Sequence, residues 1–173
     1  MNYANIKSYD IANGPGVRVS LFVSGCTHKC KGCFNSIAWD FNYGSIFDEK
    51  VENKILEYLK PDYITGLTLL GGEPFEVENQ KALLPLVKKV KELYPNKTIW
   101  AYSGYLFDKE LLTESRARCE VTDELLSLID VLVDGRFELE NKDITLVFRG
   151  SKNQRIIDVK KSLENKEVIL FNL

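Results

Sequence analysis

Short apolar runs alternate with amphipathic stretches along most of the chain. A run such as Val17–Val23 is rich in β-branched residues, which favour strands. Gly66–Leu70 (GLTLL) is a short, mainly apolar run that ends in Gly71-Gly72, and Asp130–Val133 (DVLV) ends at Asp134-Gly135, so both predict buried strands. The predicted strands are, in chain order, Val17–Val23, Gly66–Leu70, Thr98–Ser103, Asp130–Val133, Thr145–Arg149 and Val168–Phe171.

Apolar residues spaced three or four positions apart predict helices between these strands. The first helix begins after Asp48, a good N-cap residue, and ends before Pro61. A longer helix extends from Val77 to Tyr94, and Pro85 inside it predicts a kink or a separate first turn. The remaining predicted helices are Leu106–Arg118, Thr122–Ile129 and Ile156–Leu163.

The alternation of strands and helices predicts an α/β fold with a mostly parallel sheet. A length of 173 residues predicts one domain, residues 1–173, and falls short of the ~250 residues of a complete eight-fold barrel. The expected architecture is therefore an open, incomplete (β/α) barrel or a doubly wound sheet. Ligands bind at the carboxyl ends of the strands in both.

Glycines and polar residues follow five of the predicted strands. The segments are Ser24-Gly25-Cys26, Gly71-Gly72-Glu73-Pro74, Ser103-Gly104, Asp134-Gly135-Arg136 and Arg149-Gly150-Ser151. The carboxyl ends of parallel strands meet at one edge of a sheet, so these loops are expected to form the floor of one site. Glycine is also common in ordinary turns between helices and strands, which is the alternative interpretation.

Composition and charge exclude several functional classes. Apolar residues make up 45% of the chain, and 23 basic against 25 acidic residues give a net charge of −2, which does not indicate a nucleic-acid partner. No stretch approaches the ~18 apolar residues of a membrane span. The start of the chain lacks the layout of a signal peptide. We therefore expect a cytoplasmic protein without a membrane partner, whose thiols stay reduced.

Three of the four cysteines, Cys26, Cys30 and Cys33, have a C-x3-C-x2-C spacing. Soft thiolates select iron–sulfur clusters, zinc or copper(I). A cubane cluster held by three cysteines keeps one iron open to an outside ligand, which is a catalytic feature. The alternatives are three unlinked cysteines, or a zinc site with His28 or Cys119 as the fourth ligand. His28 is also interpreted as a group beside the cluster, either behind the ligands or facing solvent, and Cys119 as a free buried thiol.

The cysteine spacing, placed after a strand and followed by Phe34, resembles the signature of the radical S-adenosylmethionine (SAM) enzymes. The Gly-Gly-Glu-Pro sequence at Gly71–Pro74 resembles a second motif of that superfamily, the GGEP motif. Asn13–Arg18, with the sequence Asn-Gly-Pro-Gly-Val-Arg, resembles the activases of glycyl-radical enzymes. The two superfamily motifs occur in the expected order and at the expected strand ends.

Other residues resemble one branch of these activases, which acts on the anaerobic ribonucleoside-triphosphate reductase. Activases of the pyruvate formate-lyase type usually have Asp at the position of Asn13. The Cys-Phe-Asn run at Cys33–Asn35 and the segment Arg149–Gln154 also resemble this branch, although its members often have Ser-Ser where this chain has Ser151-Lys152. The resemblance covers about residues 9–155.

The resemblance implies an open, incomplete barrel of the radical SAM type. It implies that Cys26, Cys30 and Cys33 bind three irons of a [4Fe–4S] cluster and that SAM binds the fourth. The residues implied to contact SAM are Gly32, Cys33, Phe34, Gly71, Gly72, Glu73 and Ser103. Electron transfer from the reduced cluster would cleave SAM into methionine and a 5′-deoxyadenosyl radical, so catalysis works through the cluster cysteines and no side-chain acid or base is assigned.

The resemblance also implies the substrate and the partners. The radical would remove a hydrogen atom from a glycine of the large reductase subunit, and an external one-electron donor of the flavodoxin or ferredoxin type would reduce the cluster. A homodimer is compatible with the resemblance. Two other classes stay open: a radical SAM enzyme acting on a small molecule, and a non-catalytic metal or electron-transfer module.

Four polar residues follow the later strands without a settled role. Arg136 and Arg149 are either carboxylate-binding guanidinium groups or solvated loop charges. Asn153 and Gln154 are candidates for docking the partner, with helix capping as the alternative. The tail after Arg155 has no assigned role.

Overall fold

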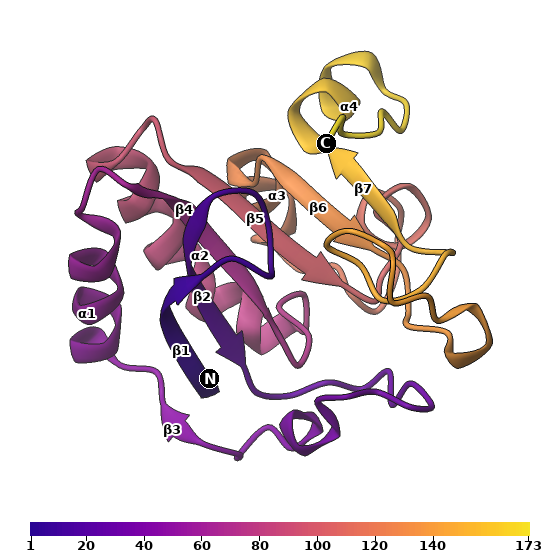
Figure 1. Cartoon of the computed structure of the whole chain (residues 1–173), viewed down its shortest axis with the longest axis horizontal. Helices are drawn as coiled ribbons and strands as arrows, with labels where there is room; N and C mark the ends of the chain where they lie inside the picture. Colours follow the sequence, from indigo (N-terminus) through magenta and orange to yellow (C-terminus); the bar gives the residue numbers. More distant parts are fainter.

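Seven strands form one open sheet in the computed structural model, which describes residues 1–173. The strands are β1 (Asn2–Asp10), β2 (Val17–Val23), β3 (Ser45–Ile46), β4 (Ile64–Gly71), β5 (Thr98–Ser103), β6 (Val131–Asp134) and β7 (Arg155–Asp158). Their order in the sheet is β3-β1-β2-β4-β5-β6-β7, and β2, β4, β5 and β6 are parallel (Figure 1). β1, β3 and β7 pair antiparallel with their neighbours. The sheet does not close, which confirms the predicted open, incomplete barrel.

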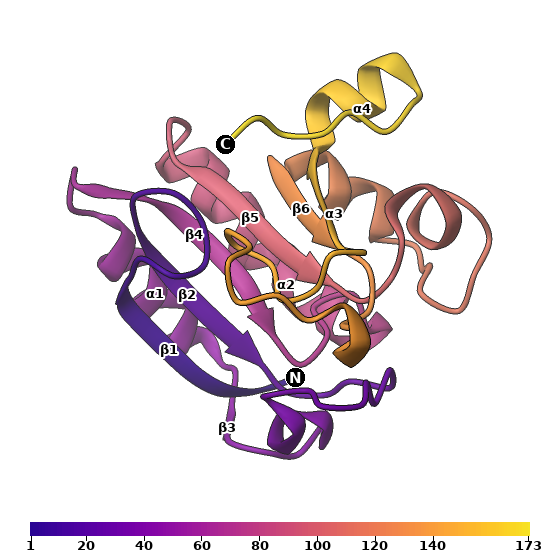
Figure 2. The ribbon, with the colours of Figure 1, turned by 45° about the vertical axis from the view of Figure 1, so that its right-hand side comes forward.

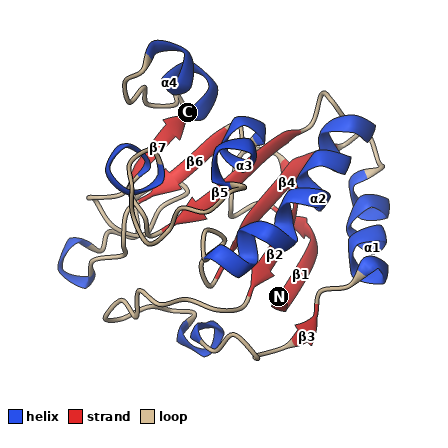
Figure 3. Ribbon diagram, turned by 180° about the vertical axis from the view of Figure 1, so that it is seen from behind, coloured by secondary structure: helices blue, strands red, loops and turns tan.

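Three helices cover one face of this sheet (Figure 3). They are α1 (Glu49–Leu59), α2 (Val77–Leu93) and α3 (Thr122–Leu128), and α4 (Val159–Asn165) follows β7 at the edge. Single helical turns occupy Ser36–Trp39, Phe107–Leu111 and Leu139–Asn141. Between the helices and the sheet lie 27 buried apolar side chains, the main core of the molecule. No helix has both the length and the apolar character needed to cross a membrane.

The helices α1 and α2 follow the predicted boundaries closely. The Asp48 side chain accepts a hydrogen bond from the Val51 N–H at 3.0 Å, so it caps α1 as expected. α2 is one continuous helix through Pro85, and the prediction of a separate first turn is wrong. Pro85 removes one backbone donor, but Leu83 and Leu86 on either side of it are fully buried, and this packing holds the helix together.

The predicted helix over Leu106–Arg118 is wrong. Only Phe107–Leu111 is helical, as a single π-helical turn, and bends follow it. The hydroxyl groups of Thr113 and Ser115 donate hydrogen bonds to backbone carbonyls four or five residues earlier. Such side-chain bonds compete with the backbone pattern of a helix, which explains why the apolar spacing alone misleads here.

The last third of the chain also differs from the prediction. Thr145–Arg149 forms no strand, and the predicted helix over Ile156–Leu163 begins as the antiparallel strand β7 and turns into α4 only after Asp158. Val168–Phe171 makes a single bridge to β7 and no strand of its own. The outer edge of β6 has backbone N–H and C=O groups that need hydrogen-bond partners, and residues 155–158 supply them as β7. This distant requirement overrides the helical spacing of the apolar residues in that segment. The sequence prediction also missed β1 and β3.

Two loops cross the face of the sheet that the helices leave uncovered. The connection from β6 to β7, residues 135–154, lies over the carboxyl ends of β4 and β5 (Figure 2). The connection from β1 to β2, residues 11–16, lies near the opposite end. Between these loops, Trp100 packs edge-on against the rings of Phe148 and Phe171, so the tail helps to close this face.

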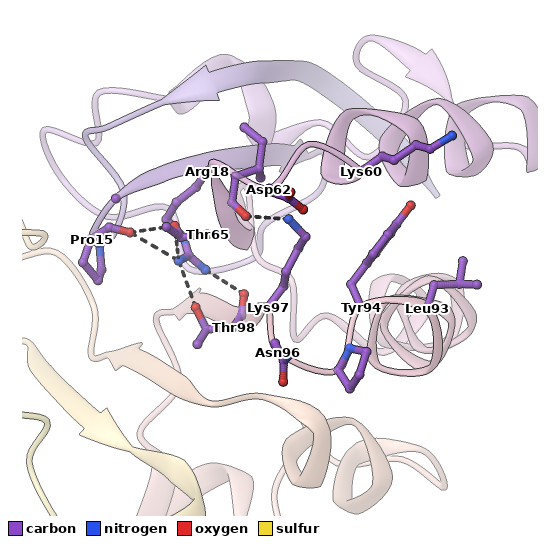
Figure 4. Close-up of a pocket in the computed structure, with 13 residues that line it drawn as sticks. Pro15, Arg18, Lys60, Asp62, Thr65, Leu93, Tyr94, Asn96, Lys97 and Thr98 are labelled. Atoms are coloured by element: carbon purple, nitrogen blue, oxygen red, sulfur yellow. Dashed lines mark hydrogen bonds between the residues drawn. The ribbon is translucent and has the colours of Figure 1, made fainter.

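A hollow of about 630 Å³ lies at the amino ends of β2, β4 and β5 (Figure 4). Arg18 is fully buried beside it, and its guanidinium donates to the Thr68 hydroxyl at 2.8 Å and to the hydroxyl and carbonyl of Thr98 at 3.0 and 2.9 Å. Further bonds reach the carbonyls of Leu67 and Pro15. Burial lowers the pKa of Arg18 to about 10. Its donors therefore serve to join three strands.

We expect Arg18→Met to lower the free energy of unfolding by at least about 3 kcal/mol, because several buried acceptors would lose their donor. Urea unfolding of the cluster-free protein, followed by circular dichroism, measures this loss. Lys60→Met is the matched control, since Lys60 borders the same hollow but is exposed, and its effect should stay below about 0.5 kcal/mol. Equal midpoints for the two variants would contradict the assignment.

Candidate functional site

A second cavity, of about 430 Å³, lies at the carboxyl ends of the parallel strands. All five loops that the sequence singled out contribute to its lining, for example through Cys26, Gly72, Ser103, Gly135 and Arg149. The prediction that these loops form one floor is therefore confirmed, although the last of them comes from the β6–β7 connection and not from a strand end. Ala12 and Asn13 complete the wall from the other side.

Cys26, Cys30 and Cys33 all line this cavity. They lie on one segment, residues 24–35, called the cysteine loop below. Cys26 is buried at the end of β2, where its N–H donates to the Trp39 carbonyl at 3.1 Å, and the other two cysteines are half-buried. Cys119 lies outside the cavity, beside the Gln80 side chain. The structure thus brings together the three predicted thiols and leaves the fourth apart.

The surroundings of the thiols suit cluster-bound sulfur. Burial raises the pKa of Cys26 and Cys30, and hydrogen bonding from backbone N–H groups acts against it: from His28 and Lys29 at Cys26, and from Phe137 at Cys30. Hydrogen bonds of this kind stabilise negative charge on sulfur and tune the potential of an iron–sulfur cluster. The local backbone therefore fits thiolate ligands.

The two residues considered as a fourth ligand of a zinc site have other surroundings in the structure. Both ring nitrogens of His28 are already engaged with protein groups, and Cys119 is remote. These positions argue against the zinc alternative for either residue.

The turn at Gly71–Pro74, called the GGEP turn below, packs directly on the cysteine loop. The Gly72 N–H donates to the Val23 carbonyl and the Glu73 N–H to the Gly25 carbonyl, both at 2.8 Å. Gly71 has φ +107°, and a Cβ on Gly72 would lie 2.5 Å from the Gly25 carbonyl oxygen. Only glycine permits this approach of two backbones.

The Glu73 carboxylate is buried and fully hydrogen-bonded inside the protein. One oxygen accepts from the Phe75 N–H at 2.8 Å and the Ser103 hydroxyl at 2.9 Å. The other accepts from His28 Nε2 and the Gly104 N–H, both at 2.7 Å. A carboxylate offers about four acceptor positions, so none remains free. A direct contact between Glu73 and SAM, implied by the resemblance, stays a prediction and requires one of these donors to leave.

The remaining predicted contact residues lie on the cavity wall. Gly32 and Phe34 line its rim, and the Phe34 ring is 93% exposed. Ser103 is nearly buried, and its oxygen also accepts from the Tyr105 N–H at 3.0 Å. Phe34 therefore presents a free aromatic surface to the cavity mouth, whereas the Ser103 hydroxyl is committed to protein partners.

The two arginines of the site differ in what they can still bind. Arg136 donates through Nε to His28 and through its terminal nitrogens to Glu110. The hydrogen bond with Glu110 raises the pKa of Arg136. Arg149 makes one bond, from a terminal nitrogen to the Gln154 carbonyl at 2.6 Å. Arg149 is consequently the guanidinium in the cavity with donors to spare for a carboxylate.

Asn153 and Gln154 hold the wall of the cavity together. The Asn153 amide donates to the Arg136 carbonyl at 2.8 Å, and the Gln154 amide donates to the Gly135 carbonyl at 3.0 Å. The Gln154 side-chain oxygen accepts from the Gly150 N–H at 2.9 Å. These bonds fix the β6–β7 connection against the end of β6.

Sequence reasoning did not recognise the central place of His28. The interpretation of His28 as facing solvent is wrong, because its side chain is only 3% exposed and lies between the cysteine loop and the GGEP turn. The available signal was that the single histidine of the chain falls inside the cysteine motif. Its partners lie far along the chain, which spacing alone does not reveal.

Burial raises the pKa of Cys26 from an ordinary value of 9.0 to about 12. In the cluster-free protein, the rate constant for modification of Cys26 by iodoacetamide should therefore rise tenfold with each pH unit from pH 7.5 to 10.5. The reason is that thiolate is the reactive form. At pH 8 its thiolate fraction should be about a thousandfold below that in unfolded protein. Mass spectrometry of the labelled peptide measures the rate, and a plateau near pH 9, as expected in urea, would contradict the burial.

Comparison with known proteins gives a consistent result. Residues 12–157 match the family model described as a 4Fe-4S single cluster domain. A protein of Pasteurella multocida called anaerobic ribonucleoside-triphosphate reductase-activating protein is 48% identical over 158 residues, which cover 90% of this chain and 96% of the relative. Proteins with the same name from Escherichia coli K12 and phage T4 are 42% and 40% identical, over 89% and 90% of this chain and 96% and 93% of their own lengths.

Proposed function

The chain belongs to the family of the anaerobic ribonucleoside-triphosphate reductase-activating proteins, and we propose on this basis that it installs a glycyl radical on that reductase by using a [4Fe–4S] cluster and SAM. The observation that carries the proposal is that the three thiols of the cysteine loop and the GGEP turn line the same cavity. An external one-electron donor of the flavodoxin or ferredoxin class supplies the electron.

Cys26, Cys30 and Cys33 are the proposed cluster ligands. Burial raises the pKa of both Cys26 and Cys30, so metal binding has to displace their protons. Hydrogen bonding from the neighbouring backbone N–H groups opposes this effect and stabilises the thiolates once they form. When bound, the cluster supplies the electron that cleaves SAM into methionine and the 5′-deoxyadenosyl radical.

The rest of the cavity provides groups suited to the parts of SAM. Backbone atoms of Gly71 and Gly72 are the proposed contacts of the methionine amino group, because no side chain shields them. Arg149 has free N–H donors for the carboxylate, and the exposed Phe34 ring beside Gly32 offers a surface for the adenine. Glu73 and Ser103 keep these groups in place by joining the loops that carry them.

The open sheet suits a protein as the substrate. With SAM bound, the chemistry supplied would be removal of a hydrogen atom from the Cα of a reductase glycine by the 5′-deoxyadenosyl radical, giving 5′-deoxyadenosine and a glycyl radical. A glycine in a protein loop reaches the cavity only when the site has a wide mouth, and the lining includes the exposed side chains of Phe34 and Ile144. The two other classes, a small-molecule radical SAM enzyme and an electron carrier, are distinguished below.

Electron paramagnetic resonance of the reconstituted, reduced protein is the primary test. The proposal requires a [4Fe–4S] signal that changes when SAM is added, because SAM binds the open iron. Cys30→Ala should abolish SAM cleavage, with a loss of at least about a hundredfold, and Cys119→Ala should retain iron and activity since Cys119 lies outside the cavity. A signal that ignores SAM would favour an electron carrier, and undiminished cleavage by Cys30→Ala would overturn the ligand assignment.

Addition of the reductase then separates the remaining alternatives. SAM cleavage should produce a glycyl radical signal on the reductase, in an amount that depends on the activating chain. Cleavage that proceeds with a metabolite and leaves the reductase without a radical would favour a small-molecule enzyme.

A further inference from the structure

We propose that His28 is a positioning residue, which fixes the cysteine loop relative to the GGEP turn and thereby sets the affinity of the site for SAM. The inference rests on the proposed function and adds a residue to it. His28 touches no reacting atom in this assignment and is no metal ligand. Its effect passes through the protein groups that it holds.

Only one tautomer of His28 is consistent with its two hydrogen bonds. Arg136 Nε lies 3.1 Å from His28 Nδ1, and a guanidinium N–H can only donate, so Nδ1 is the acceptor. The ring proton therefore lies on Nε2, which donates to the Glu73 carboxylate at 2.7 Å. Each ring nitrogen thus has one partner, and the two bonds together orient the ring.

Close packing adds to this orientation. The Tyr105 ring meets the His28 ring edge-on, with centroids 4.4 Å apart. Gly104 lies directly against the imidazole, since a Cβ at this position would be 2.5 Å from a ring carbon. The ring therefore contacts the GGEP turn after β4, the loop after β5 and Arg136 after β6, while its own backbone belongs to the loop after β2.

The contacts continue beyond the ring to the wall of the cavity. Arg136 pairs with Glu110 at 2.9 Å, and Glu110 accepts the Leu106 N–H at 2.8 Å. The Arg136 guanidinium also lies over the Tyr105 ring, 5.9 Å from its centroid. Loss of the histidine would leave Arg136 without its Nε acceptor and the buried Glu73 carboxylate with one donor fewer, which is unfavourable for a buried charge.

The position of His28 in the chain explains which property it controls. Cys26 and Cys30, the proposed cluster ligands, lie two residues to either side of it, whereas Glu73 belongs to the turn proposed to hold the amino group of SAM. Cluster assembly depends on the thiols and the adjacent N–H groups, which do not involve the imidazole. Its removal should therefore weaken SAM binding more than iron binding.

The test compares two substitutions in the full-length, reconstituted protein. A glutamine amide can donate to Glu73 and accept from Arg136, so His28→Gln retains both bonds, whereas His28→Leu retains neither. Iron content should equal that of the wild type in both variants. The SAM concentration that half-converts the electron paramagnetic resonance signal should rise at least tenfold in His28→Leu and stay within threefold in His28→Gln.

A second variant keeps the test independent of the histidine itself. Gly104→Ala displaces the imidazole from its place and should also raise the SAM midpoint, with iron content unchanged. Wild-type midpoints in His28→Leu, equal impairment of the Leu and Gln variants, or iron loss in step with the SAM effect would each overturn the role of His28 alone. A wild-type signal indifferent to SAM would instead overturn the proposed function, and this inference with it.

Discussion

The site depends on one buried carboxylate, that of Glu73. Its four hydrogen bonds come from the cysteine loop, from its own turn and from the loop after β5, so one charge connects three loops that start on different strands. An ionised group without water costs several kcal/mol unless hydrogen bonds compensate it. The donors must therefore assemble together, and the loops that line the cavity acquire fixed positions as a consequence.

A buried ion of opposite sign lies at the other end of the same strands. Arg18 donates to hydroxyl and carbonyl groups of β4 and β5 at their amino ends, and no carboxylate accepts from it. At both ends of the parallel strands, neutral groups therefore fill the hydrogen-bonding positions of one buried charge, Arg18 or Glu73. The consequences differ between the two ends. At the amino ends the saturated charge joins the strands themselves, whereas at the carboxyl ends it arranges loops around a cavity. The same division between stability and chemistry is found in complete (β/α) barrels.

Prediction from the sequence succeeded where the local residue pattern and the tertiary contacts favour the same structure. β2 and β5 have the predicted bounds because a β-branched or aromatic run that is buried on both faces suits only a strand. The residues 106–118 and the start of β7 were predicted wrongly because hydroxyl side chains and the edge of β6 decide their structure. The contacts of His28 escaped prediction because its partners Glu73 and Arg136 lie 45 and 108 positions away. The cysteine and glycine motifs were accessible because each is a short local pattern.

The arrangement also bears on how radical chemistry proceeds in so open a molecule. A reactive radical requires a site from which water is excluded, and the cavity of this chain has exposed apolar side chains in its lining. The inner side consists of saturated polar groups such as Glu73 and Ser103, which are nearly buried, while Phe34 and Ile144 at the mouth are 93% and 90% exposed. Apolar side chains in such a position gain free energy when a second surface covers them. Under the proposed function, the reductase is both the substrate and the surface that covers these side chains, so radical formation is coupled to the presence of its target.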